Sequence, residues 1–228
     1  MRTKMNTILN SPIEISQTLS NNHENSKLQV RIYSVDGTLA TFTQEDPAVV
    51  EHIVGDCQRP DFFKQERIAV AGHHSVTTLV LSKVARIDLA GEGLPRWKPP
   101  SGVGMSVRDI VELPEQEFFY QVESRDLKHV ERRRVHLSPG RPAVAFIAIQ
   151  LSGGRHMYLK VEMVDALPAE RLQRIRAFME LPGLSFRLEG GGLGLVNLTN
   201  AVKFTAYPGP AEVPTDAWSA NEGEGDAL

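Results

Sequence analysis

The chain has a single cysteine and no long apolar run, and these two absences exclude several classes of protein. Cys57 alone cannot form an intramolecular disulfide or a cysteine-rich zinc module, which favours a reducing compartment. No apolar run approaches the roughly 18 residues of a membrane span. The polar segment at the N-terminus lacks the apolar core of a signal peptide. We therefore expect a cytoplasmic protein without a membrane partner.

The chain also lacks an excess of positive charge. It carries 25 Lys and Arg residues against 28 Asp and Glu residues, a formal net charge of −3 at pH 7. Such a balance gives no global field that would attract nucleic acid or anionic membrane. Hydrophobic residues make up 41% and charged residues 23%, which is ordinary for a folded globular protein. Any binding of polyanions would have to be local.

What the sequence does contain is an internal similarity. The segment Leu81–Leu89 (LSKVARIDL) is followed 117 residues later by the similar segment Leu198–Ala206 (LTNAVKFTA). The turn-like pair Asp36-Gly37 corresponds at the same offset to Gly153-Gly154. We interpret the chain as two copies of one β-β-α-β-β unit. The alternative is that two unrelated hairpins share an apolar pattern.

Local patterns predict the same order of elements in both copies. In the first copy, Asp46-Pro47 is a good helix start, and apolar residues then recur at helical spacing up to Cys57. Alternating apolar residues indicate strands on either side of that helix. The strands are predicted over 28–33, 39–43, 67–71, 76–81 and 84–89, and the helix over 47–57. The second copy is predicted to have strands over 144–150, 157–161, 184–188 and 193–198, with a helix over 168–181.

These patterns divide the chain into five parts. They are a flexible N-terminal arm (1–27), a first copy (28–93), a linker (94–141), a second copy (142–207) and a flexible acidic tail (208–228). The linker is predicted to contain a short helix over 106–111 and an added strand over 117–123. The expected fold class is α+β, mainly antiparallel sheet with helices on one face and pseudo-twofold symmetry. The sequence leaves open whether the copies share one sheet.

Two histidines are the candidates for a metal site. His73 and His74 are adjacent near the tip of a predicted hairpin, and His52 and Cys57 lie on the preceding helix. Adjacent residues of a strand point to opposite faces, so both histidines cannot bind one ion from a regular strand. Surface histidines and a buried thiol are the preferred interpretation, and no metal or other cofactor is assigned.

The candidates for anion binding are a basic cluster and a glycine-rich loop. Arg132, Arg133 and Arg134 could contact phosphates, and Phe118 to Tyr120 could offer stacking surfaces upstream. Mixed-sign runs of this kind are usually solvated faces. The glycines of 189–194 join two predicted strands rather than a strand and a helix, so a hairpin turn is favoured over a phosphate loop.

No arrangement of Ser, His, Asp or Glu in the sequence has the context of a catalytic site, so no catalytic residue is assigned. We expect a non-enzymatic interaction, assembly or regulatory protein that contacts a protein partner or forms a homo-oligomer. The alternative is a small-molecule-binding protein or enzyme with its site between the two copies. A weaker alternative is nucleic-acid binding through Arg132 to Arg134.

Overall fold

A computed structural model of the chain describes residues 27–72, 74–92, 94, 97, 107–124, 143–163 and 177–207. The strands in this part are β1 (Leu28–Ser34), β2 (Leu39–Gln44), β3 (Arg67–Ala71), β4 (Val76–Val80), β5 (Val84–Ala90), β6 (Val107–Glu112), β7 (Ala143–Leu151), β8 (His156–Met163), β9 (Gly183–Arg187), β10 (Leu193–Asn197) and β11 (Ala201–Tyr207). The longer helices are α1 (Pro47–Cys57) and α2 (Glu115–Ser124), and short 3-10 turns are η1 (Phe62–Lys64), η2 (Leu81–Lys83) and η5 (Leu198–Asn200).

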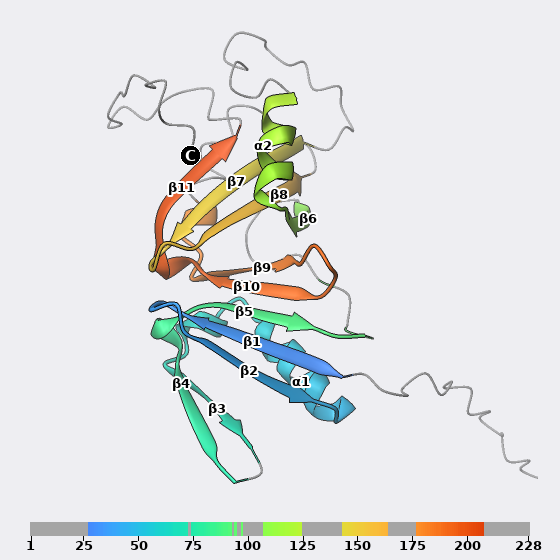
Figure 1. Cartoon of the computed structure of the whole chain (residues 1–228), viewed down its shortest axis with the longest axis vertical. Helices are drawn as coiled ribbons and strands as arrows, with labels where there is room; N and C mark the ends of the chain where they lie inside the picture. The colour runs from blue at the N-terminus through green and yellow to red at the C-terminus, as the bar shows by residue number, and fades with distance from the viewer. Residues whose placement is uncertain are drawn as a thin grey trace, which may run out of the picture.

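Within the described residues, nine strands form one sheet in the order β11-β7-β8-β6-β9-β10-β5-β1-β2 (Figure 1). The strands β3 and β4 form a separate hairpin that projects from one end of the molecule. Strands β6 and β9 are parallel, and the other neighbours in the sheet pair antiparallel. The chain is therefore an α+β protein with a large, mostly antiparallel sheet and few helices.

The first half of the chain packs α1 on β1 and β5. The Asp46 carboxylate accepts hydrogen bonds from the backbone N–H groups of Ala48 and Val49, which caps α1, and Pro47 occupies the first turn. Alternate residues of β1 are buried, as in a strand with one core face. They share one core with Val50 and Val54 of α1. The helix predicted over 47–57 is confirmed.

The second half packs elements on both faces of β7. Ile147 and Ile149 belong to a core that includes Phe178, while Phe146 contacts Phe118 of α2 with ring centroids 5.9 Å apart. Since successive residues of a strand point to opposite faces, α2 and Phe178 cover opposite faces of β7. The expectation of helices on one face was wrong. Residues 177–179 are helical, and the remainder of the helix predicted over 168–181 lies outside the described residues.

The linker contains a strand and a helix in the opposite order to the prediction. The helix predicted over 106–111 is the strand β6, which forms backbone pairs with β8 on one side and β9 on the other. The strand predicted over 117–123 is the helix α2. Its aromatic residues suggested β structure, but Phe118 and Val122 lie one helical turn apart and are both fully buried. Tertiary pairing overrode local preference in β6.

Strands β5 and β10 join the two halves into one sheet. Leu89 pairs with Leu193 and Arg86 with Val196. All five residues of β10 are buried, and so are six of the seven residues of β5. Ile87, Leu89, Leu193 and Leu195 face the core that contains α1, whereas Val196 faces the core of the second half. Both faces of the sheet are thus buried at this junction.

The two halves also share a pairing register. Val30 pairs with Leu89 between β1 and β5, and Ile147 pairs with Ala206 between β7 and β11. Corresponding residues of these two pairs are 117 residues apart (147 − 30 and 206 − 89). Each ladder has one irregularity, and beyond it Ser34 pairs with Val84 and Leu151 with Ala201, again 117 residues apart. The offset found in the sequence is therefore also an offset between hydrogen-bonded ladders.

The turn between β9 and β10 provides a test of this packing. Gly192 has φ of 105°, and a Cβ added there would overlap the carbonyl oxygen of Leu89 in β5. A left-handed conformation costs an L-residue roughly 1–2 kcal/mol before any overlap is counted. We expect Gly192→Ala to lower the free energy of unfolding by about 2 kcal/mol or more, measured by urea titration.

Gly190 supplies the matched control in the same turn. A Cβ added at Gly190 meets no atom within 4 Å. Gly190→Ala should change the free energy of unfolding by no more than about 0.5 kcal/mol. Equal effects at the two glycines would show that the turn is not held against β5.

Candidate functional site

A buried charge cluster lies where the two halves meet. Arg86 on β5 is 8% exposed, and its Nε donates to Asp88 Oδ1 at 2.6 Å while Nη2 donates to Asp88 Oδ2 at 3.1 Å. Nη2 also donates to Glu112 Oε2 at 2.7 Å, and Nη1 donates to Glu112 Oε1. Two carboxylates from β5 and from the linker strand β6 therefore hold one guanidinium group.

Aromatic rings complete the surroundings of Arg86. Its guanidinium carbon lies 5.3 Å from the centroid of the Phe186 ring and 5.8 Å from that of Tyr33. The Phe186 ring occupies the space over Gly194, where an added Cβ would overlap it. The guanidinium carbon of Arg155 lies 4.2 Å from the centroid of the same Tyr33 ring. Two cations thus contact Tyr33, one from each half of the chain.

The cluster is one guanidinium group shared by two carboxylates. Burial acts to lower the pKa of Arg86. The hydrogen bonds to Glu112 and Asp88, and the charges of these groups, together outweigh burial and raise the pKa above its ordinary value. Arg86 stays protonated, and its Nε, Nη1 and Nη2 atoms all donate to the two carboxylates. Four of the five guanidinium N–H donors are therefore engaged, and the group has little capacity left to receive an anionic ligand.

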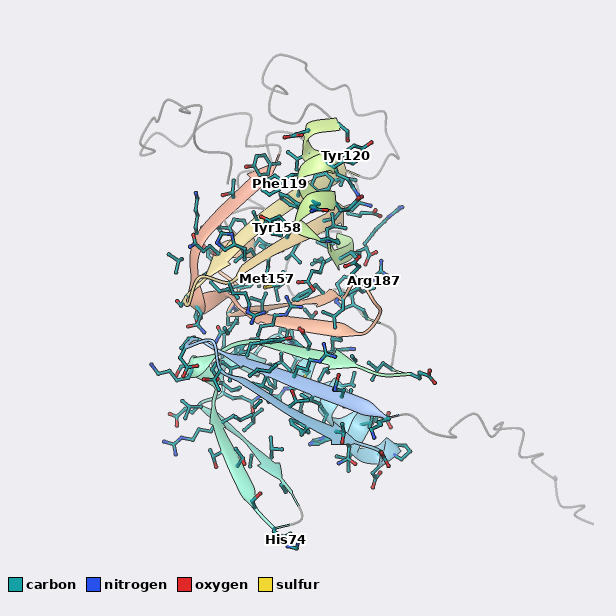
Figure 2. The ribbon with its side chains drawn as sticks, viewed as in Figure 1. His74, Phe119, Tyr120, Met157, Tyr158 and Arg187 are labelled. Carbon is teal, nitrogen blue, oxygen red and sulfur yellow. The ribbon has the colours of Figure 1, made fainter. Side chains whose placement is uncertain are left out.

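A second ion pair joins β6 to β9. Arg187 on β9 donates from Nε to Asp109 Oδ1 at 2.8 Å and from Nη2 to Asp109 Oδ2. The hydrogen bonds to Asp109 raise the pKa of Arg187, although burial acts in the opposite direction. The side chain of Arg187 is 47% exposed (Figure 2). Water therefore weakens this pair relative to the one formed by Arg86.

Most of the metal and anion candidates predicted from the sequence lie outside the described residues. His74 lies at the tip of the β3–β4 hairpin (Figure 2), and His73 lies outside the described residues. No group of three or more His, Cys, Asp or Glu side chains suited to a metal occurs among the residues that the structure describes. Arg132, Arg133 and Arg134 also lie outside them.

The aromatic residues upstream of the arginines are mostly occupied in packing. Phe118 is fully buried, and its ring centroid lies 5.0 Å from that of Tyr158 on β8. Phe119 also packs on Tyr158, with centroids 5.6 Å apart, whereas Tyr120 is 69% exposed (Figure 2). The Tyr158 hydroxyl donates to Glu115 at 2.7 Å. Burial and this hydrogen bond raise the pKa of Tyr158 to about 12.

The glycine-rich loop is a hairpin turn, as the sequence indicated. It connects the antiparallel strands β9 and β10, and Gly191 and Gly192 have positive φ angles of 85° and 105°. No helix begins at this loop among the residues that the structure describes. The free N–H groups of a helix N-terminus, which a phosphate loop requires, are therefore missing here.

The structure identifies which strands have a free edge, which the sequence did not. Strands β11 and β2 are the two edges of the large sheet, and β4 pairs with β3 alone within the described residues. Exposed apolar side chains lie on these strands, including Val76 (71%), Val80 (44%) and Val202 (68%). An unpaired, apolar strand edge can add a strand from another chain. The signal was the uncharged run VTTLV of β4.

Comparison with known proteins adds no further assignment. No family model, curated protein or solved structure matches this chain. Within the described residues, no helix is both long enough and apolar enough to cross a membrane.

The two arginines of β5 and β9 make a matched pair of test sites. Arg86→Met leaves two carboxylates at a buried junction without their cation, which should lower the free energy of unfolding by about 3–5 kcal/mol. Arg187→Met breaks an exposed pair and should cost no more than about 1 kcal/mol. Denaturant unfolding of the two variants checks this. Similar losses would contradict a structural role for Arg86 at the junction.

The single thiol should be inert in the native protein. Cys57, the last residue of α1, is buried, and burial together with the nearby Asp56 charge raises its pKa to about 12. Because only the thiolate reacts, Cys57 should react with Ellman's reagent at pH 8 after unfolding and not before. Reaction becomes favourable only as pH rises through the folded pKa. Rapid labelling of the native chain at pH 8 would contradict the burial of α1.

Proposed function

We propose that the chain is a non-enzymatic interaction protein that acts as an assembly, adaptor or regulatory component by pairing free strand edges with other protein chains. The observation that carries this proposal is where exposed apolar residues lie. Among the described residues, seven large hydrophobic side chains are exposed, and four of them (Leu39, Val76, Val80 and Val202) lie on β2, β4 and β11, each of which has one unpaired edge. Burying these side chains against a partner strand would remove them from water.

The proposal includes an internal duplication of the β-β-α-β-β unit with pseudo-twofold symmetry. The common register of the β1–β5 and β7–β11 ladders supports it. The short turns support it as well, since Val35 N donates to Lys83 O at 3.0 Å and Ser152 N donates to Asn200 O at 2.8 Å, each residue shifted by 117. If the hairpins were unrelated, there would be no physical reason for the ladder pairs, the register irregularity and the turn hydrogen bond all to be shifted by the same 117 residues. A duplicated unit that already associates through strand pairing is suited to assembly.

The ligand-binding and enzyme alternative places a site between the two halves. Its best candidate group is Arg86, and the hydrogen bonds of Arg86 go to Asp88 and Glu112. The rings of Phe186 and Tyr33 lie next to its guanidinium group. The buried chemistry at the junction is therefore better suited to holding the two halves together, and we favour the interaction proposal. Nucleic-acid binding through Arg132 to Arg134 remains a weaker prediction from sequence.

Substitution of an edge residue tests the proposed function. Val202→Lys places a charge on β11 at a position that is 68% exposed in the free chain. Burial of a valine contributes about 1.5 kcal/mol or more, and 1.4 kcal/mol is a tenfold change in affinity, so association should weaken about tenfold or more. Sedimentation velocity of the full chain over a concentration series measures the change in self-association.

Tyr120→Lys is the matched control, because Tyr120 is equally exposed, at 69%, but lies on α2 rather than on a strand edge. It should sediment as the unsubstituted chain does. A second experiment detects partners other than the chain itself. A photo-cross-linking amino acid is placed at position 202 or 120 and is activated by light in the cells that express the protein. The proposal fails if the purified chain is a monomer throughout and position 202 yields no more protein adduct than position 120.

A further inference from the structure

The pairing that joins the two halves has a counterpart that one molecule leaves unused. The internal ladder pairs Leu89 with Leu193, Asp88 with Gly194, Ile87 with Leu195, and Arg86 with Val196. Moving each residue to the other half by the common offset of 117 gives a second set of pairs. These pairs are Ala206 with Val76, Thr205 with Thr77, Phe204 with Thr78, and Lys203 with Leu79. The residues belong to β11 and β4.

Both of these strands have an edge available for pairing. Strand β11 pairs with β7 on one side and ends the large sheet, and β4 pairs with β3 in a separate hairpin, as far as the described residues extend. Figure 1 shows β11 and β4 at opposite ends of the molecule. They cannot pair with each other inside one chain. The counterpart of the internal ladder can therefore form only between two molecules.

Resting on the proposed function above, we infer that β4 of one molecule pairs antiparallel with β11 of a second copy of this chain, in the register just given. The contact is head-to-tail, since each molecule offers a different strand to its neighbours. Such heterologous contacts generate closed rings when the rotation closes, and open filaments when it does not. The inference names the partner and the register of the edges that the proposed function invokes.

The side chains along the two edges fit this register. Directly opposite residues of paired strands share a face, so Val76 and Thr78 would lie beside Ala206 and Phe204. Val80 and Val202 lie just beyond the last pair of this register. They are 44% and 68% exposed in the single chain, whereas Asn197 and Ala85 at the corresponding internal positions are 1% and 2% exposed. Pairing would bury exposed valines at sites that are buried internally.

The intermolecular ladder differs from the internal one in its polar contacts. Asn197 Nδ2 donates to the carbonyl oxygens of Leu81 and Val84, both at 3.1 Å, and Asn200 Nδ2 donates to Val84 at 3.0 Å. The residues at the corresponding positions near β4 are Val80 and Lys83. The contact between molecules therefore depends on backbone pairing and valine burial. We expect it to be reversible and to increase with protein concentration.

Cysteine cross-linking tests both the partner and the register. One mixture combines Val76→Cys with Ala206→Cys, and a second combines Thr77→Cys with Thr205→Cys. Each variant is the full chain, and one variant of each mixture carries a mass tag. Adjacent pairs in an antiparallel ladder alternate between narrow and wide spacing, so one of the two mixtures has the closer geometry. Cys57 is buried and does not compete. Mild oxidation should give a disulfide-linked dimer of tagged and untagged chains in at least one mixture.

A mixture of Thr77→Cys with Ala201→Cys is the register control. Position 201 lies four residues from position 205 along β11, or about 13 Å, so no cross-link should form. The inference is overturned if the control mixture cross-links equally well. It is also overturned if disulfide-linked dimers form only between identical variants. So does a chain that associates in sedimentation without either in-register cross-link, although the proposed function then stands. A wholly monomeric chain overturns the inference too, and the position 202 adduct decides the proposed function separately.

Discussion

The ladder between β5 and β10 is the constraint on which the rest of the structure depends. Each strand of this ladder must present apolar residues to two cores, because the helix α1 covers one face and the second half of the chain covers the other. A strand buried on both faces cannot slip by one residue without exchanging the contents of the two cores. The register of this central pairing is therefore strongly specified.

The charged groups at the junction follow from the same constraint. Arg86 and Asp88 lie on β5, where both faces are buried, so each requires a partner at close range. Part of that partnership comes from Glu112 on β6, a strand supplied by the linker. The linker is therefore a structural part of the second half: β6 lies between β8 and β9, while no strand in the described first half lies between β2 and β3. The two halves differ most where this strand was added.

Much of the fold could be predicted from the sequence because its signals are local. Asp46-Pro47 marks the start of α1, and alternating residues mark β1. The common offset of 117 indicated which strands correspond. The linker was predicted wrongly because Val107, Ile110 and Val111 match a helical spacing, although this segment is a strand fixed by its neighbours in the sheet. The four-residue spacing of Phe118 and Val122 was the contrary signal, outweighed by the β-forming aromatic residues.

The candidate site was harder to predict, because it consists of relations between distant residues. The Arg86–Glu112 pair depends on the position of β6. The exposure of Val202 depends on β11 ending the large sheet, and that of Val76 on β4 forming a separate hairpin with β3. His74 and the glycine loop were visible in the sequence as residue types, but their places at turns give them no common geometry. Edges of a sheet are a property of topology, and composition alone does not identify them.

The central ladder also has a consequence for biosynthesis. Ile87 pairs with Leu195, so 108 residues (195 − 87) must be translated after β5 before its partner exists. At typical rates of about 5–20 residues per second, β5 waits roughly 5–20 seconds on the ribosome with one apolar edge unpaired. During that interval β10 of another chain would offer the same pairing, which is the condition under which chains exchange halves.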